Sequence, residues 1–226
     1  MKRNCQSADQ VRWFELPSHM VFHYVNAWEE KNEAGDDIIK CYGCSTPGAD
    51  FNLDFTEEHT FLKGPQAPHV HRFIFNLTTG ACEMTPIFDD FAGEFPIIDW
   101  DCIGYKNKYC YMSEFQTTLP DDSHGQLSMY FEAVCKFDLE TEKLVKRIKF
   151  GPTKAAGEVF FHKRENPKSE DDGYLMSFVY DWETKTSEFV MWDALSMSEE
   201  PVFVAPTKIR VPNGFHSIFV PEAELE

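Results

Sequence analysis

A short pattern recurs three times in the chain: an aromatic residue, then Asn or Asp, then Thr three positions later. The copies occupy residues 75–80, 137–142 and 180–185, and each closes an apolar run. An Asn or Asp side chain can accept a hydrogen bond from the backbone two residues on, so each copy predicts a tight turn between two strands. Hardly any window shows helical spacing of apolar residues. The chain is therefore predicted to be all-β.

The apolar runs rich in Phe, Tyr, Val and Ile predict individual strands. We expect them at residues 38–44, 72–77, 100–104, 109–115, 143–150, 174–180 and 187–192. Residues 105–108 predict a further turn, and residues 52–68 predict a long connection. Hairpins that recur on the scale of one blade, about 40–45 residues plus insertions, favour a β-propeller. A β-sandwich is the alternative.

The charge balance restricts the kind of partner. Asp and Glu outnumber Lys and Arg by 38 to 21, which gives a formal net charge of −17. Such a surface repels phosphate backbones and anionic lipid headgroups, so a nucleic acid partner is not expected. The basic run at residues 143–149 alternates with apolar residues, as the outer face of a strand does. A length of 226 residues suits one all-β domain.

Cysteine usage and the lack of a targeting signal predict a reducing, intracellular location. The seven cysteines are irregularly spaced, unlike those of small disulfide-rich secreted domains. Cys41 and Cys44 form a single Cys-x-x-Cys pair, which is interpreted as a structural coincidence because no second pair follows. No apolar run is long enough to span a bilayer, and the polar residues 1–12 do not resemble a signal peptide.

Four polar residues stand out because they interrupt apolar sequence: His23, His216, Glu94 and Glu158. A buried charge without a partner is costly, so imidazole–carboxylate pairs are expected. A metal-binding histidine usually donates its other ring N–H to a carboxylate or carbonyl. The set therefore predicts a metal site with two histidine ligands and two glutamates that orient them. The alternative is that each histidine is a satisfied core residue and each glutamate a turn residue.

The other candidate positions are weaker. His69 and His71 alternate along an extended segment, where core or surface positions are expected rather than a pair of metal ligands. Residues 91–99 and 170–173 are interpreted as loops, the second an ordinary acidic one. The chain has no hydrolase elbow, phosphate-binding loop or His-Glu-x-x-His motif. The remaining histidines lie among polar or turn residues without a constellation: His19, His59, His124 and His162.

Several stretches resemble, in this order, the C-terminal part of the carotenoid cleavage oxygenases. They lie at residues 13–17, 22–29, 93–99, 157–161, 170–179 and 212–216. The family's His-x-x-Asn-x-aromatic-Glu motif falls on His23, Asn26, Trp28 and Glu29, and its Pro-x-Gly-Phe-His motif ends at His216. The resemblance implies a seven-bladed β-propeller, with residues 1–12 as a polar segment and residues 13–226 as the C-terminal part of the propeller.

The resemblance also implies a site and a reaction. In this family a ferrous ion, Fe(II), is held by four histidines, three of them backed by glutamates. His23 looks like the third ligand and His216 like the fourth, while Glu94 and Glu158 look like supporting acids. The implied enzyme is a non-haem iron dioxygenase that adds dioxygen across a conjugated double bond of a carotenoid or apocarotenoid. The first two ligands would precede Met1, so an incomplete C-terminal fragment is expected.

Two other functions stay open at this point. One is a catalytically inactive partial propeller that binds an apolar ligand or a protein. The other keeps an iron site within this chain, built from His23, His216 and one of Glu94 or Glu158. The location is expected to be cytoplasmic or plastid, and the resemblance leaves open a peripheral membrane contact by the full-length protein.

Overall fold

The computed structural model describes residues 6–47, 67–88, 90–115, 130–212 and 214–225. This part of the chain is built from β-strands and a few single-turn 3₁₀ helices, and its strand pairings are antiparallel. The all-β prediction is therefore confirmed. None of the described helices is long and apolar enough to cross a membrane.

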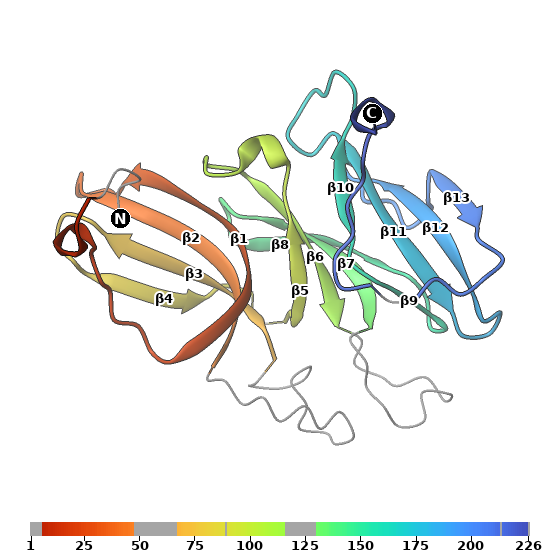
Figure 1. Cartoon of the computed structure of the whole chain (residues 1–226), viewed down its shortest axis with the longest axis horizontal. Helices are drawn as coiled ribbons and strands as arrows, with labels where there is room; N and C mark the ends of the chain where they lie inside the picture. The colour runs from red at the N-terminus through yellow and green to blue at the C-terminus, as the bar shows by residue number, and fades with distance from the viewer. Residues whose placement is uncertain (1–5, 48–66, 89, 116–129, 213, 226) are drawn as a thin grey trace.

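The strands form three antiparallel groups that stand side by side (Figure 1). The first is a four-stranded sheet in the order β1-β2-β3-β4. Its strands are β1 (His19–Lys31), β2 (Asp37–Pro47), β3 (His69–Asn76) and β4 (Cys82–Pro86). The predicted strand at residues 38–44 lies within β2, and the predicted strand at residues 72–77 lies within β3 except for its last residue. Of the predicted connection at residues 52–68, residues 52–66 lie outside the described part.

The second and third groups share one nine-stranded sheet, in which β9 pairs with both β7 and β11. The second group consists of β5 (Gly93–Ile97), β6 (Tyr109–Phe115), β7 (Phe131–Asp138) and β8 (Lys143–Lys149). The third consists of β9 (Lys154–Ala156), β10 (Phe160–Lys163), β11 (Gly173–Asp181), β12 (Thr186–Asp193) and β13 (Phe203–Pro206). Each group is an antiparallel meander of the kind that forms a propeller blade.

The three repeated turns form as predicted. Asn76 accepts hydrogen bonds from the N–H groups of the residues two and three positions on, each at 2.9 Å. Asp138 makes the same pair of bonds, and Asp181 accepts from the residue two positions on. These turns join β3 to β4, β7 to β8 and β11 to β12. A local side-chain bond thus ends three strands at the same relative place.

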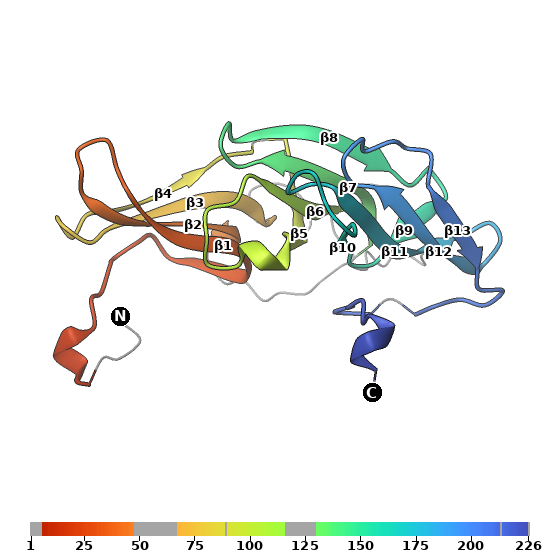
Figure 2. The same cartoon turned by 90° about the horizontal axis from the view of Figure 1, so that it is seen from above.

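The core lies between neighbouring blades, because the middle blade is buried on both faces. Along β6, Cys110 and Met112 pack towards the first sheet, whereas Tyr111 packs towards the third group. Along β7, Phe137 and Val134 divide in the same way. Successive side chains of a strand point to opposite faces, so one strand fills two cores. Seen from above, the blades form an arch (Figure 2).

The region after residue 90 departs from the sequence-based expectation. Residues 93–97 of the predicted loop form strand β5, which pairs with β6. The predicted strand at residues 100–104 is wrong, because Trp100–Cys102 is a 3₁₀ helix. The Asp99 carboxylate accepts a hydrogen bond from the N–H of Asp101 and so caps this helix.

The acidic segment before β11 is not an ordinary solvated loop. Glu170 accepts hydrogen bonds from the backbone N–H groups of Lys108 and Tyr109. Asp171 is buried and forms an ion pair with the buried Lys136 at 2.6 Å. Burial alone would raise the pKa of Asp171, but the hydrogen bonds from Lys136 and Ser169 hold it below its ordinary value. The segment therefore ties the second blade to the third.

The Cys-x-x-Cys pair lies within strand β2 rather than at a metal-binding loop. Cys41 and Cys44 are buried, and the Cys44 Sγ lies 3.8 Å from the Met112 Sδ. Burial raises the pKa of Cys41 to about 12, so its thiol is protonated at neutral pH. Both side chains are core residues.

Candidate metal centre

His23 lies on β1 and meets Glu94 of β5 across the gap between the first and second blades. The His23 Nδ1 is 2.7 Å from the Glu94 Oε2, and the two side chains are 25% and 6% exposed. The hydrogen bond with Glu94 raises the pKa of His23, although burial acts in the opposite direction. Burial raises the pKa of Glu94, and its bonds to His23 and Phe95 only partly offset this.

Strand β5 is shaped around Glu94. Its pairing with β6 is irregular between Glu94 and Ile97, and Phe95 has a φ of 55°, in the left-handed region that non-glycine residues rarely adopt. This turn of the backbone lets the Phe95 N–H donate to the Glu94 Oε2 at 2.9 Å. The other carboxylate oxygen, Oε1, is buried and has no hydrogen-bond partner among the described residues. The strained residue, Phe95, directly follows Glu94, which holds His23.

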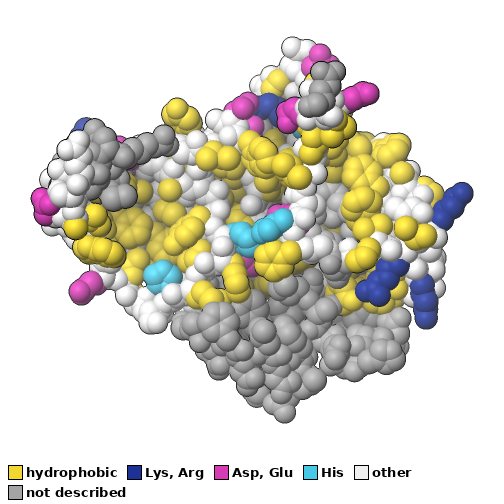
Figure 3. All heavy atoms as spheres, in the orientation of Figure 1, with side chains coloured by type: hydrophobic (Ala, Val, Ile, Leu, Met, Phe, Trp, Pro, Cys, Tyr) yellow, Lys and Arg dark blue, Asp and Glu magenta, His cyan; other side chains and the backbone are white. Residues whose placement is uncertain are grey.

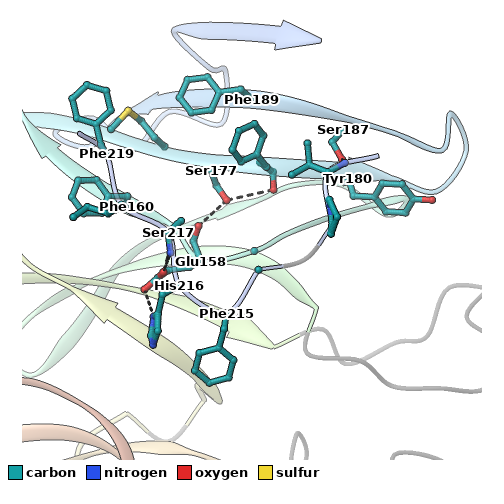
Figure 4. A pocket seen from close by; sticks show the side chains of 17 residues that line it. Glu158, Phe160, Ser177, Tyr180, Ser187, Phe189, Phe215, His216, Ser217 and Phe219 are labelled. Atoms are coloured by element: carbon teal, nitrogen blue, oxygen red, sulfur yellow. Dashed lines mark hydrogen bonds and ion pairs between the residues drawn. The ribbon is translucent and has the colours of Figure 1, made fainter. Parts of the chain in front are cut away.

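His216 reaches the same place from the C-terminal segment that follows β13. Its Nδ1 is 3.3 Å from the Glu158 Oε1, with side-chain exposures of 54% and 15%. The backbone N–H of Ser217 donates to the Glu158 Oε2, and the Ser177 hydroxyl donates to the Glu158 backbone carbonyl. Figure 4 shows Glu158 between His216 and Ser177. The glutamate thus joins the C-terminal segment to strand β11.

The two imidazoles meet through their remaining nitrogens. The His23 Nε2 lies 3.3 Å from the His216 Nε2, and the two rings are perpendicular. If each Nδ1–H donates to its carboxylate, both Nε2 atoms carry lone pairs that face each other. That arrangement is unfavourable unless a proton or a cation lies between the nitrogens. Two nitrogen ligands at right angles around one metal, each about 2.1 Å from it, are about 3 Å apart, so the pair fits a metal ion.

Aromatic rings surround the histidine pair. Phe95 lies 5.3 Å from the His23 ring and 5.4 Å from the His216 ring, measured between centroids. Phe215 packs against Phe95 at 5.6 Å. In Figure 3, histidine side chains lie near the centre of this face with hydrophobic side chains around them. An apolar surround strengthens electrostatic interactions at the nitrogens.

A cavity of about 130 Å³ adjoins the His216 end of the site (Figure 4). Its wall is mostly apolar and comes from the third blade and the C-terminal segment. Phe160, Phe189 and Phe219 contribute rings, while Glu158 and His216 contribute its polar edge. The cavity is thus apolar with a few polar groups at one end, as small-molecule sites commonly are.

A second group of histidines lies elsewhere. His19, His69 and His71 line one open cavity at the ends of β1 and β3. Each Nδ1 is within 3.0 Å of a backbone carbonyl oxygen. Within the described ranges, no group of three or more His, Cys, Asp or Glu side chains has an arrangement that could hold a metal by itself. This applies both to this cavity and to the His23–His216 site.

All four predicted site residues therefore lie in one cluster, although 193 positions separate the two histidines. Sequence reasoning missed two features that support them. The first is the positive φ of Phe95, for which the sequence carries no signal. The second is the buried amide of Asn26, whose only signal is its place in the motif that contains His23.

Comparison with known proteins gives a consistent result. The family model described as retinal pigment epithelial membrane protein matches residues 1–221. The chain is 33% identical over 232 residues to the 9-cis-epoxycarotenoid dioxygenase NCED1, chloroplastic, of Oryza sativa subsp. japonica, a match over 99% of this chain and 33% of that protein. It is 31% identical over 240 residues to a carotenoid 9,10(9',10')-cleavage dioxygenase of Crocus sativus, over 100% of this chain and 41% of the relative.

Solved structures agree on the fold. The Pseudomonas brassicacearum lignostilbene dioxygenase matches with a TM-score of 0.74 and 23% identity, over 90% of this chain and 42% of that one. The cobalt-substituted Synechocystis ACO matches with a TM-score of 0.67 and 25% identity, over 88% and 39%. The predicted partial seven-bladed β-propeller is thus confirmed, and the chain spans about a third to two fifths of these relatives. The chain belongs to the carotenoid cleavage oxygenase family, whose family model is that of the retinal pigment epithelial membrane protein.

Proposed function

We propose that this chain is the C-terminal portion of a non-haem iron(II) dioxygenase that cleaves a conjugated double bond of a carotenoid or apocarotenoid. In this proposal His23 and His216 bind the iron, and further ligands come from sequence beyond this chain. The observation that carries it is the approach of the two Nε2 atoms to 3.3 Å. Imidazole ligands suit iron(II), and a two-histidine set leaves positions open for other ligands and for dioxygen.

The chain's own residues have separate tasks in this proposal. Glu94 and Glu158 accept the Nδ1–H bonds and so keep each Nε2 lone pair directed at the ion. Phe95 packs beside both imidazoles, and Phe215 packs against Phe95. When bound, iron(II) supplies the dioxygen chemistry that organic side chains lack. In the overall reaction, one carbon–carbon double bond and one molecule of dioxygen are consumed. The two oxygen atoms become the carbonyl oxygens of the two products.

The substrate class and the location come from the relatives. The rice and Crocus relatives are named as dioxygenases that act on carotenoids. The rice relative is also named as chloroplastic. We therefore include a carotenoid or apocarotenoid substrate and a plastid location in the proposal. The apolar cavity beside His216 is compatible with a hydrocarbon ligand.

Anaerobic titration with cobalt(II), followed by its visible absorption, tests the metal site. We expect the chain to bind cobalt, and we expect His23→Ala and His216→Ala each to weaken that binding. His71→Ala is a matched control, because His71 is a half-buried β-strand histidine whose Nδ1 also has a protein partner. Equal cobalt affinity in the wild type and in the double variant His23→Ala/His216→Ala would refute the site.

A second candidate function is a metal-independent module that binds an apolar ligand. The cavity of about 130 Å³ and the exposed Phe215 and Phe219 favour it. A retinoid-type aldehyde should then quench tryptophan fluorescence equally in the wild type and in His23→Ala, because His23 is a proposed metal ligand that does not line the cavity. If ligand binding instead requires metal loading, the dioxygenase proposal is preferred.

A further inference from the structure

The side-chain amide of Asn26 on β1 forms hydrogen bonds with the irregular segment that follows β5 in the second blade. Asn26 follows His23 by three positions and is 8% exposed. Its Oδ1 accepts from the N–H groups of Ala27 and Gly104, and its two N–H groups are shared among three acceptors at 2.9–3.0 Å, namely the carbonyl oxygens of Cys102 and Tyr105 and the Oδ1 of Asn107. An Asn amide offers two N–H donors and two acceptor lone pairs. The group therefore has no spare capacity for a ligand, and its role is to hold the backbone.

The backbone that Asn26 holds is irregular at His23. The pairing of β1 with β2 shifts register between Val21 and Tyr24, and again between Tyr24 and Asn26. From Asn26 to Lys31 the pairing is regular. Extra residues in one strand form β-bulges, which change the direction of a side chain. His23 thus lies within the first of two irregularities, and Asn26 begins the regular part.

The opposite strand is adapted to this bulge. Gly43 lies across from Tyr24, and a Cβ atom placed on it would come within 2.9 Å of the Tyr24 ring. Any larger residue would have to displace the Tyr24 ring at this point. The bulge is therefore supported by a glycine on one side and by the Asn26 amide on the other.

The segment bound by Asn26 follows the strand that carries Glu94. Strand β5 ends at Ile97, and the Trp100–Cys102 helix and the turn to Asn107 come directly after it. One amide thus connects the strand of His23 to the continuation of the strand of Glu94. A slip of one residue in a strand turns its side chains to the other face, which would remove His23 from the site.

We infer that Asn26 is a positioning residue, which sets the His23 imidazole against Glu94 and so directs its Nε2 at the metal. This inference rests on the proposed function for the metal, but it concerns the His23–Glu94 hydrogen bond, which can be measured in the metal-free chain. The hydrogen bonds of the Asn26 amide are all with protein groups, so Asn26 acts through β1.

The test compares Asn26→Asp with Asn76→Asp. Asn76 is a suitable control, because its amide also makes three hydrogen bonds in the same sheet, far from His23. The first readout is the Nδ1–H resonance of His23 in ¹⁵N-histidine NMR of the metal-free chain. We expect Asn26→Asp to shift or remove this resonance, because a carboxylate cannot donate to the carbonyls of Cys102 and Tyr105. Asn76→Asp should leave it unchanged.

The second readout is cobalt(II) affinity, which should fall about tenfold in Asn26→Asp and stay constant in Asn76→Asp. If Asn26→Asp fails to fold, Asn107→Ala removes one acceptor from the other side and should shift the resonance in the same direction by less. An unchanged His23 resonance in folded Asn26→Asp or Asn107→Ala would overturn the inference. If His23→Ala instead bound cobalt(II) as tightly as the wild type, the proposed metal site would be overturned. The NMR result would still decide the role of Asn26.

Discussion

The two histidines reach the same point from very different surroundings. We call His23 with Glu94 the strand arm, and His216 with Glu158 the tail arm. The strand arm lies on two β-strands, has a bond of 2.7 Å, and its glutamate is 6% exposed. The tail arm ends in an irregular segment, has a bond of 3.3 Å, and its histidine is 54% exposed. The chain therefore contains one rigid half of a metal site and one half that is held by fewer contacts.

The difference teaches how such a site is assembled. The strand arm is fixed by sheet pairing, by the strained backbone at Phe95 and by the Asn26 amide. The tail arm depends on Glu158, which binds the side chain of His216 and the backbone of Ser217. We expect the strand arm to be present before metal binds and the tail arm to be completed by it.

The largest effect is expected when a ligand nitrogen is removed, and here the arms should be alike. His23→Ala and His216→Ala each remove one imidazole from the ion. Each should weaken cobalt(II) binding by more than the roughly 10–100-fold that is typical of losing a group that supports a ligand. A titration of both variants measures this. Retained affinity in one variant alone would show that its arm does not bind metal.

Replacing the glutamates should lower cobalt(II) affinity by different amounts in the two arms. Glu94→Gln keeps the shape but removes the buried charge that holds His23, so we expect a loss of cobalt affinity near 100-fold. Glu158→Gln changes a more exposed and longer bond, so its loss should be near tenfold. Parallel titrations measure both. A larger loss in Glu158→Gln would reverse the comparison.

The stability of the metal-free chain should follow the same order. Glu94→Ala leaves the His23 and Phe95 N–H groups without their acceptor in a buried place, which should lower the free energy of unfolding by about 1–3 kcal/mol. Glu158→Ala should cost under about 1 kcal/mol, because its partners are reached by water. Urea denaturation followed by tryptophan fluorescence measures both. Equal costs would contradict the proposed rigidity of the strand arm.

The smallest effect is expected at Ser217. Its backbone N–H donates to Glu158, whereas its hydroxyl lies 3.5 Å from the same oxygen. Ser217→Ala keeps the N–H, so cobalt affinity should change less than about twofold and stability by less than about 0.5 kcal/mol. The cobalt titration and urea denaturation used above measure both quantities. A large loss would show that the hydroxyl, rather than the backbone, holds the tail arm.

Features made by neighbouring residues were predictable from the sequence. The turns at Asn76, Asp138 and Asp181 depend on bonds across two or three residues, so a local pattern predicts them. The prediction of an ordinary acidic loop was wrong, because Asp171 is buried in an ion pair with Lys136, which lies 35 positions earlier. When two residues that form an ion pair or bind one ligand are far apart in the sequence, no local pattern of residues predicts their contact.

The sequence predicted which residues form the site, but not how they are arranged. Glycine before Glu94 and Glu158, and apolar residues around His23 and His216, marked four residues. Their geometry depends on the bulges of β1, the φ of Phe95 and the course of the C-terminal segment. Each of these depends on contacts between residues that are distant in the sequence, which a single strand's pattern does not encode.

The most direct test is a metal titration of the ¹⁵N-histidine-labelled chain, observed by NMR under anaerobic conditions. The eight histidines serve as one another's controls. Substoichiometric iron(II) or cobalt(II) should broaden or shift the Nε2 signals of His23 and His216 first, together and in proportion to the metal added. Signals of His19, His69 and His71 should change only later. Equal or earlier changes at His69 and His71, with His23 and His216 unaffected, would contradict the account.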